Sequence, residues 1–314
     1  MPARSDLGAI QLYKVKAIIR EDVRLLLHHT PALAKVLRYS IMATNTPAPL
    51  REGYEIRQLT VEHLEWVKAI VGHTMSFDSP IWSKRYPNDQ AGRAYKMAEA
   101  IGPSSLSCIE SGLSYGVFIR GWTPRYPDTK PGGELRWNTR DLAASREKLL
   151  EQMDFALVSI AMSKDWASPK STGSTEAQLS WADVVEGHAL LADTLKARDQ
   201  SGKVWSPPKD PKYLGKVLKR SGTHTRGDHI SKGLAKALAH FVMRDAAAKG
   251  FQGILIHTGS VGVHGIWENP PAPFKAHVVS EYNTGNPPLS FENAPVLCKR
   301  IWVELKEERK GERE

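Results

Sequence analysis

A short turn and the helix that follows it carry the pattern of an anion-binding site. Gly233-Leu234-Ala235 places small residues at the first turn of the helix, where backbone N–H groups have no intrahelical partner. These N–H groups and the positive end of the helix dipole favour an anion, above all a phosphate or a pyrophosphate. The chemistry predicted for this turn is therefore recognition of a phosphorylated ligand.

The residues after the turn indicate a helix followed by a buried strand. Apolar residues recur at helical spacing from Leu234 to Val242, which predicts one buried helix face. Gly250 follows Lys249 at the point where a helix usually ends. The continuous apolar run Ile254–Ile256 is typical of a strand that is covered on both faces. The turn is thus expected to lie between two strands of a packed sheet.

This order of elements resembles the acetyl-CoA-binding core of the GNAT superfamily of N-acetyltransferases. The family pattern, Arg/Gln-x-x-Gly-x-Gly/Ala, is matched at Gly233-Leu234-Ala235, whereas its first position falls on Ile230. Ser260–Trp267 resembles the family's fourth helix. In element order the resemblance covers roughly residues 53–305.

The resemblance implies an α/β (α+β) fold with a mixed, mostly antiparallel, twisted sheet flanked by helices. We expect an N-terminal helical extension and linker at residues 1–50, one GNAT-like domain at 51–306 and a charged tail at 307–314. Two insertions, at about 121–154 and 163–212, interrupt the expected order of strands. Because they flank one strand, they are predicted to enlarge the acceptor side of the domain.

The resemblance also implies acetyl-CoA, or another acyl-CoA, as cofactor and an amine of a small molecule or a peptide as acceptor. The acyl group would pass directly to the amine in a ternary complex. Arg226 or Lys232 would supply the cation that is missing at Ile230. The predicted cofactor-binding residues are Thr225, Arg226, Ile230, Lys232, Gly233, Leu234, Ala235 and Lys236.

Transfer from a thioester to an amine needs a base for the amine and a polarised carbonyl oxygen. His224 lies six positions before Ile230, a spacing that suits a base facing the thioester, and an imidazole titrates near neutrality. A strand histidine bonded to a loop is the alternative interpretation of His224, and Glu110 is a second candidate base. Many family members protonate the leaving thiolate with a tyrosine of the fourth helix. Trp267 occupies the corresponding turn here, and an indole cannot donate such a proton. Three alternatives stay open: His264 or another group is the donor, solvent is the donor, or the protein does not transfer acyl groups.

Aromatic residues in two loops form a candidate wall for the acceptor. Their side chains would suit a flat or apolar molecule, although core packing explains them equally well. The predicted substrate residues are Trp82, Tyr86, Trp122, Tyr126 and Trp137.

Other classes of function stay open. A GNAT-like protein that binds CoA or another ligand without transfer is favoured by Ile230 and Trp267. A nucleic-acid-binding protein is favoured by the net charge of +9, but the basic residues are scattered rather than clustered in a stripe. His224, Asp228 and His229 have no spacing typical of a zinc site, so no metal is predicted.

Composition points to a cytoplasmic globular protein. The 314 residues are 41% hydrophobic and 25% charged, and no apolar run approaches the roughly 20 residues that span a bilayer, so no membrane is predicted. Cys108 and Cys298 form no Cys-x-x-Cys motif, which favours a reducing compartment. Residues 1–40 contain a predicted amphipathic helix that could serve in a homodimer. Glu21 and Asp22 argue against a mitochondrial presequence there.

Overall fold

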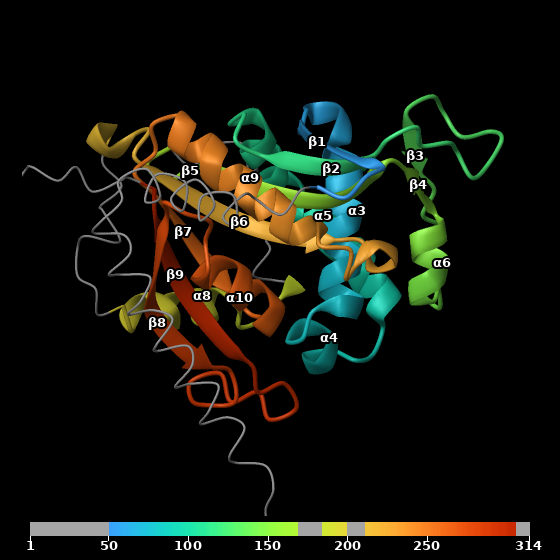
Figure 1. Cartoon of the computed structure of the whole chain (residues 1–314). Helices are drawn as coiled ribbons and strands as arrows, with labels where there is room; N and C mark the ends of the chain where they lie inside the picture. Colours follow the sequence, from blue (N-terminus) through green and yellow to red (C-terminus); the bar gives the residue numbers. More distant parts are fainter. Residues whose placement is uncertain (1–49, 169–183, 200–210, 306–314) are drawn as a thin grey trace, which may run out of the picture. The chain divides into compact units, whose positions relative to one another are not determined.

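The computed structural model describes residues 50–168, 184–199 and 211–305, all within the unit Pro47–Glu314 (Figure 1). The predicted N-terminal helix and the charged tail lie outside the described residues. So do residues 169–183 and 200–210 of the second predicted insertion.

The core of the described chain is a seven-stranded sheet with the order β1-β2-β5-β6-β7-β9-β8. Neighbouring strands are antiparallel except β6 and β7, which are parallel. The predicted mixed, mostly antiparallel sheet is therefore confirmed. Its strands are β1 (Tyr54–Gln58), β2 (Tyr115–Ile119), β5 (Leu157–Asp165), β6 (Val217–Thr225), β7 (Gly253–Thr258), β9 (Leu297–Glu304) and β8 (Lys275–Asn283).

Helices flank the sheet because each presents an apolar stripe to it. None of the helices in the described ranges has both the length and the apolar composition needed to cross a membrane. The helical segments are η1 (Val61–His63), α3 (Leu64–His73), η2 (Thr74–Asp78), α4 (Trp82–Arg85), α5 (Gln90–Glu110), α6 (Arg146–Glu151), α8 (His188–Ala197), η4 (Pro211–Tyr213), η5 (Gly227–His229), α9 (Leu234–Ala248) and α10 (Val261–Glu268).

The two faces of the sheet are covered by different helices (Figure 1). On one face, Leu238 of α9 and Trp267 of α10 belong to a buried cluster with Leu218 of β6. On the other face, Ile70 of α3 and Ile160 of β5 belong to a second buried cluster, to which α5 also contributes. Strand β6 therefore separates a face with α9 and α10 from a face with α3 and α5.

The first predicted insertion contains less helix than its sequence indicates. The sequence from Thr139 to Met153 is typical of a helix with Asp141 in its first turn, but α6 begins only at Arg146. The hydroxyl of Ser145 caps it by accepting a hydrogen bond from the Lys148 amide at 3.1 Å. Asp141 instead holds the Lys148 ammonium group at 2.6 Å. The same segment contains a two-stranded sheet of β3 (Gly133–Leu135) and β4 (Met153–Phe155).

Candidate functional site

Strands β6 and β7 are paired only at their beginnings. Parallel pairing joins Val217–Lys219 of β6 to Gly253–Leu255 of β7 and extends no further. Strand β6 stays paired with β5 as far as Thr225, while β7 stays paired with β9 as far as Thr258. The facing edges of the two strands therefore carry backbone N–H and C=O groups with no ladder between them. Such an edge can hydrogen-bond an extended ligand, as in strand addition.

A β-bulge lies where β6 leaves β7. In the ladder with β5, Met162 is opposite Gly222 and Ser163 is opposite Arg220, so Ser221 is the extra residue. A bulge redirects the side chains around it and increases the local twist. It separates the beginning of β6, which pairs with β7, from the end that carries His224.

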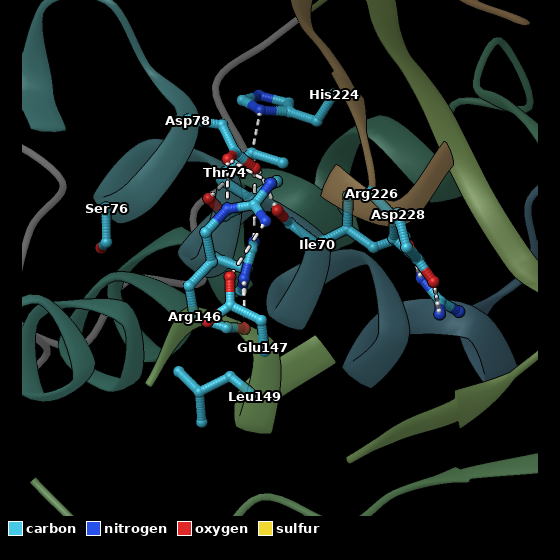
Figure 2. Close-up of polar contacts among 12 residues, drawn as sticks. Ile70, Thr74, Ser76, Asp78, Arg146, Glu147, Leu149, His224, Arg226 and Asp228 are labelled. Carbon is cyan, nitrogen blue, oxygen red and sulfur yellow. Dashed lines mark hydrogen bonds and ion pairs between the residues drawn. The ribbon is translucent and has the colours of Figure 1, made fainter. Parts of the chain in front are cut away.

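The imidazole of His224 is half-buried and oriented by Thr74, as Figure 2 shows. The Thr74 hydroxyl lies 2.7 Å from Nδ1 of His224 and donates its own hydrogen to the carbonyl oxygen of Ile70 at 2.8 Å. It must therefore accept the hydrogen of Nδ1, which leaves Nε2 as an unprotonated acceptor. Burial, and to a smaller extent the Arg220 guanidinium, lowers the pKa of His224 to about 4. At neutral pH the ring is a neutral base with a fixed tautomer.

The Thr74 hydroxyl is expected to determine this tautomer. In Thr74→Val the acceptor of the Nδ1 hydrogen is lost, so the ring should exchange between its two neutral forms. Nitrogen-15 chemical shifts of the two ring atoms at pH 7 would measure this: a single tautomer in the wild type and a mixture in the variant. Thr74→Ser keeps the hydroxyl and serves as the control. Identical tautomer populations in the wild type and Thr74→Val would contradict the assignment.

The buried side chain of Arg226 stabilises the turn between β6 and α9. Its guanidinium is buried, binds both carboxylate oxygens of Asp228 at 3.1 and 2.7 Å, and donates to the carbonyl oxygens of Met153 and Phe155. Burial alone would raise the pKa of the Asp228 carboxyl, but the guanidinium brings it below the ordinary value. Arg226, which the sequence offers as a replacement cation for a phosphate, therefore has its charge matched within the turn.

Helix α9 begins at an exposed glycine. Gly233 is its N-cap with a φ of 76°, in the left-handed region, and a Cβ placed there would meet no atom within 4 Å. The first-turn N–H groups, which have no partner within the helix, follow this glycine at the positive end of a 15-residue helix. Lys232 lies beside this end, with its ammonium nitrogen 3.3 Å from Nδ1 of His229. The side chain of Ile230 is 52% exposed.

A polar network joins this turn to the segment that carries Thr74. The π-helix η2 runs from Thr74 to Asp78, and π-helical turns are frequent at functional sites. Asp78 accepts from the Arg146 guanidinium at 2.8 Å, and Nδ1 of His73 lies 3.5 Å from its other oxygen (Figure 2). Burial raises the pKa of Asp78, but the His73 and Arg146 contacts outweigh it and lower the pKa. The Arg146 guanidinium packs against Gly227, where a Cβ would collide with it.

Gly227→Ala is expected to destabilise the fold by about 1 kcal/mol, because the added methyl group overlaps the Arg146 guanidinium and displaces it from Asp78. The free energy of unfolding in urea would measure the loss. In an Arg146→Ala background the same substitution should cost much less, since the colliding group is gone. Equal costs in the two backgrounds would show that the collision is not the cause.

The other two predicted catalytic residues lie on α10 and α5. His264 is buried in α10, where burial lowers its pKa, and its Nε2 has no hydrogen-bond partner among the residues described. Glu110 is the exposed last residue of α5. No hydrogen bond or ion pair joins either side chain to His224 in the described chain.

The predicted aromatic wall separates into two groups. Trp82 and Tyr86 stack with ring centres 6.5 Å apart, and Phe291 meets Trp82 edge-on at 5.9 Å. Trp137 donates to the carbonyl oxygen of Leu149 and meets Tyr95 edge-on at 5.5 Å. Within the described ranges no ring contact joins the first pair to the remaining residues of the predicted set, which are Trp122, Tyr126 and Trp137.

Four site residues escape a search of the sequence: Thr74, Asp78, Arg146 and Arg220. Each is a common polar residue that belongs to no recognisable motif. Thr74, Asp78 and Arg146 contact side chains that are far away in the sequence, and Arg220 binds backbone carbonyl groups at the bulge. As for metals, no three His, Cys, Asp or Glu side chains of the described ranges gather closely enough to hold an ion.

Solved structures share this arrangement of strands and helices. The C-terminal condensation domain of Ebony, solved with β-alanyl-dopamine, matches at a TM-score of 0.53 and 14% identity, covering 82% of this chain and 100% of the domain. A protein named as arylalkylamine N-acetyltransferase 7 of the yellow fever mosquito matches at 0.50 and 10% identity, covering 81% of this chain and 88% of its own. The chain has the GNAT fold.

The GNAT fold is the extent of this likeness, because the identities are low. The yncA protein of Salmonella typhimurium, solved with acetyl-CoA, matches at a TM-score of 0.38 and 11% identity over 82% of this chain and 97% of its own. No model of a protein family matches the sequence, and neither does any curated protein. In this GNAT fold, β6 and β7 correspond to the expected fourth and fifth strands, and α9 to the helix that follows the phosphate turn.

Proposed function

We propose that the chain is an acyl-CoA-dependent N-acyltransferase that passes an acyl group, such as acetyl, directly to an amine. The observation that carries this proposal is the parting of β6 and β7 after three paired residues. The parted edges lead from the open start of α9, suited to a pyrophosphate, to the neutral base His224. These features would bind the phosphates of CoA, hold the thioester and accept the proton of the amine.

The cofactor is proposed to lie along the open edge of β6. Its pyrophosphate would accept hydrogen bonds from the N–H groups of Gly233–Lys236, with Lys232 and Lys236 as nearby cations. Backbone groups of β6 from Arg220 to Thr225 would pair with the amides of the pantetheine arm. Ile230 would meet the cofactor through its exposed apolar side chain. Arg226 is assigned to shaping the turn, since Asp228 already matches its charge.

His224 is proposed to remove the proton from the acceptor amine. Its Nε2 is the unprotonated ring atom, and a lowered pKa keeps it so throughout the neutral range. A backbone N–H of β6 would polarise the carbonyl oxygen of the acyl group. The thioester supplies the activated acyl group, and the protein holds it against the amine.

The acceptor is proposed to be a small arylalkylamine. One of the two neighbouring structures above is named as an arylalkylamine N-acetyltransferase, and the other was solved with β-alanyl-dopamine, in which the amine of an arylalkylamine is acylated. In this chain, the ring of Tyr86 is partly exposed and stacks on the buried ring of Trp82, within the cluster on the face that carries His224. Peptide amines are the second class to test, because the same surface would also suit them.

Calorimetric titration of the full chain with acetyl-CoA and with CoA, at two salt concentrations, tests the cofactor part of this proposal. Saturable binding in the micromolar range is expected, followed by turnover with a panel of arylalkylamines and peptides. Binding without turnover would favour the alternative of a CoA-binding protein that has lost transfer. That alternative is motivated by Ile230 and by the buried indole of Trp267. No binding would remove the acyltransferase proposal.

A further inference from the structure

Arg220 is a buried cation, and no carboxylate of the described residues neutralises it. Its side chain is 4% exposed, and no ion pair joins it to any of the described acidic residues. Transfer of an unpaired charge out of water is costly, so a buried guanidinium is normally matched by an anion. The positive charge at the bulge of β6 therefore calls for an anionic partner, and residues 50–168, 184–199 and 211–305 supply none.

The hydrogen bonds of Arg220 decide what kind of anion can serve. One terminal nitrogen donates to the carbonyl oxygen of Met162 and the hydroxyl of Ser163, and the other to the carbonyl oxygen of Gly222 and the hydroxyl of Thr223. All these acceptors are neutral. Among the described residues, both terminal nitrogens of the guanidinium have partners, and Nε has none. A carboxylate bound by two parallel hydrogen bonds would need two unpartnered nitrogens, whereas an anion that contacts the guanidinium through one atom would need only Nε.

Arg220 and His224 lie on opposite faces of β6. The guanidinium carbon of Arg220 is 5.7 Å from the ring centre of Trp267, on the face covered by α9 and α10. His224 contacts Thr74, on the face covered by α3 (Figure 2). A thioester held between the parted strands would thus have His224 on one side and the Arg220 guanidinium on the other. The amine would approach from the side of His224, and the sulfur would point towards Arg220.

We propose that Arg220 stabilises the leaving CoA thiolate, in place of a proton donor. This inference rests on the CoA site proposed above. As the amine nitrogen bonds to the carbonyl carbon, the carbon–sulfur bond breaks and its electron pair goes to sulfur. The amine proton goes to Nε2 of His224. The sulfur leaves as an anion beside the guanidinium and takes its proton later from water. Trp267, which occupies the turn where an acid was expected, instead packs against the cation.

The charge on Arg220 persists at the pH of such a reaction. Burial lowers the pKa of the guanidinium to about 10, which still leaves it protonated at neutral pH. Its charge interacts with two titratable groups, Cys108 of α5 and His224 of β6 itself. The His224 imidazole is neutral at that pH and does not add to the positive charge.

The test is a pH titration of the thiol of CoA bound to the full chain, followed through the ultraviolet absorbance of its thiolate. Binding is first measured by calorimetry, so a missing CoA site is recognised before the titration begins. Protein without CoA gives the background of Cys108 and Cys298. A free thiol titrates at about 8.5. We expect the pKa of the bound thiol to be lower than that of free CoA by at least about one unit, as for thiols beside cations.

Three variants separate charge from structure. Arg220→Gln keeps an amide donor but no charge, and should return the thiol to the pKa of free CoA. Arg220→Lys keeps the charge and should retain most of the shift. Lys219→Gln removes a cation whose side chain lies over Trp166, in a separate cluster, and should leave the thiol pKa unchanged. Equal shifts in the wild type and Arg220→Gln, or loss of the shift in Arg220→Lys, would overturn the proposal. If Arg220→Gln does not fold, the wild-type complex is sufficient for the test. A bound thiol with the same pKa as free CoA would overturn the proposal.

Discussion

Gly233→Glu is expected to weaken acetyl-CoA binding by at least a hundredfold, a loss of about 2.8 kcal/mol of binding free energy. Gly233 is the exposed N-cap of α9, and the N–H groups beside it are the proposed pyrophosphate site. A carboxylate at this position would both occupy the space of the pyrophosphate and repel its charge. Because a Cβ meets nothing within 4 Å, the folded state should lose only the cost of a left-handed residue, about 1–2 kcal/mol.

Two controls separate the effect on binding from the effect on the backbone. Gly233→Ala carries the same left-handed cost without charge, and should weaken binding much less than glutamate does. Gly250→Glu places the same residue at the other end of α9, where φ is 85° and a Cβ is also free of contacts. It should leave acetyl-CoA affinity unchanged. Calorimetric affinity and urea unfolding of all three variants would provide the comparison. Undiminished affinity in Gly233→Glu would place the cofactor elsewhere.

The fold could be predicted from the sequence because its signals are local and regular. The apolar run Ile254–Ile256 is a buried strand in the structure, and the predicted helix before it is α9. In the sequence, the strand that becomes β6 is indicated by two runs, Val217-Leu218 and Thr223–Thr225. It is continuous, because polar residues between the pieces form a bulge whose carbonyl groups are bound by Arg220. A buried arginine inside a strand gives no periodic signal.

The partners in the site could not be predicted, because pairing in space leaves no local pattern. Thr74 and His224 are 150 residues apart, and Asp78 and Arg146 are 68 apart. One signal was local and could have been used. Arg226 and Asp228 are two residues apart across a Gly turn, a spacing that allows the bidentate pair observed. That pairing indicates a structural role for Arg226 rather than a free cation.

His224→Ala is expected to retain CoA binding and to lower the rate of acyl transfer by about 10²–10⁴, the usual contribution of general base catalysis. The ring lies on the face of β6 away from the proposed thiol position, so its removal should not disturb the cofactor. His277→Gln, on the outer strand β8, is the matched control and should keep the wild-type rate. Full activity in His224→Ala would remove His224 as the base.

The pH dependence distinguishes a lost base from a disturbed fold. Since burial lowers the pKa of His224 to about 4, its neutral, active form predominates at every pH above about 5. Protonation of the amine itself affects wild type and His224→Ala alike, and therefore cancels in the ratio of their rates. That ratio should be constant from pH 8 down to about 5, and should fall as the pH approaches 4. Circular dichroism at each pH would verify folding. The pKa of His224 is lower in the folded state than in the unfolded state, so the protein loses stability as the pH falls from 6.5 to 4. A ratio that already falls between pH 7 and 6 would mean that the base has the ordinary pKa of a histidine. Burial would then not lower the pKa of His224 as the structure indicates.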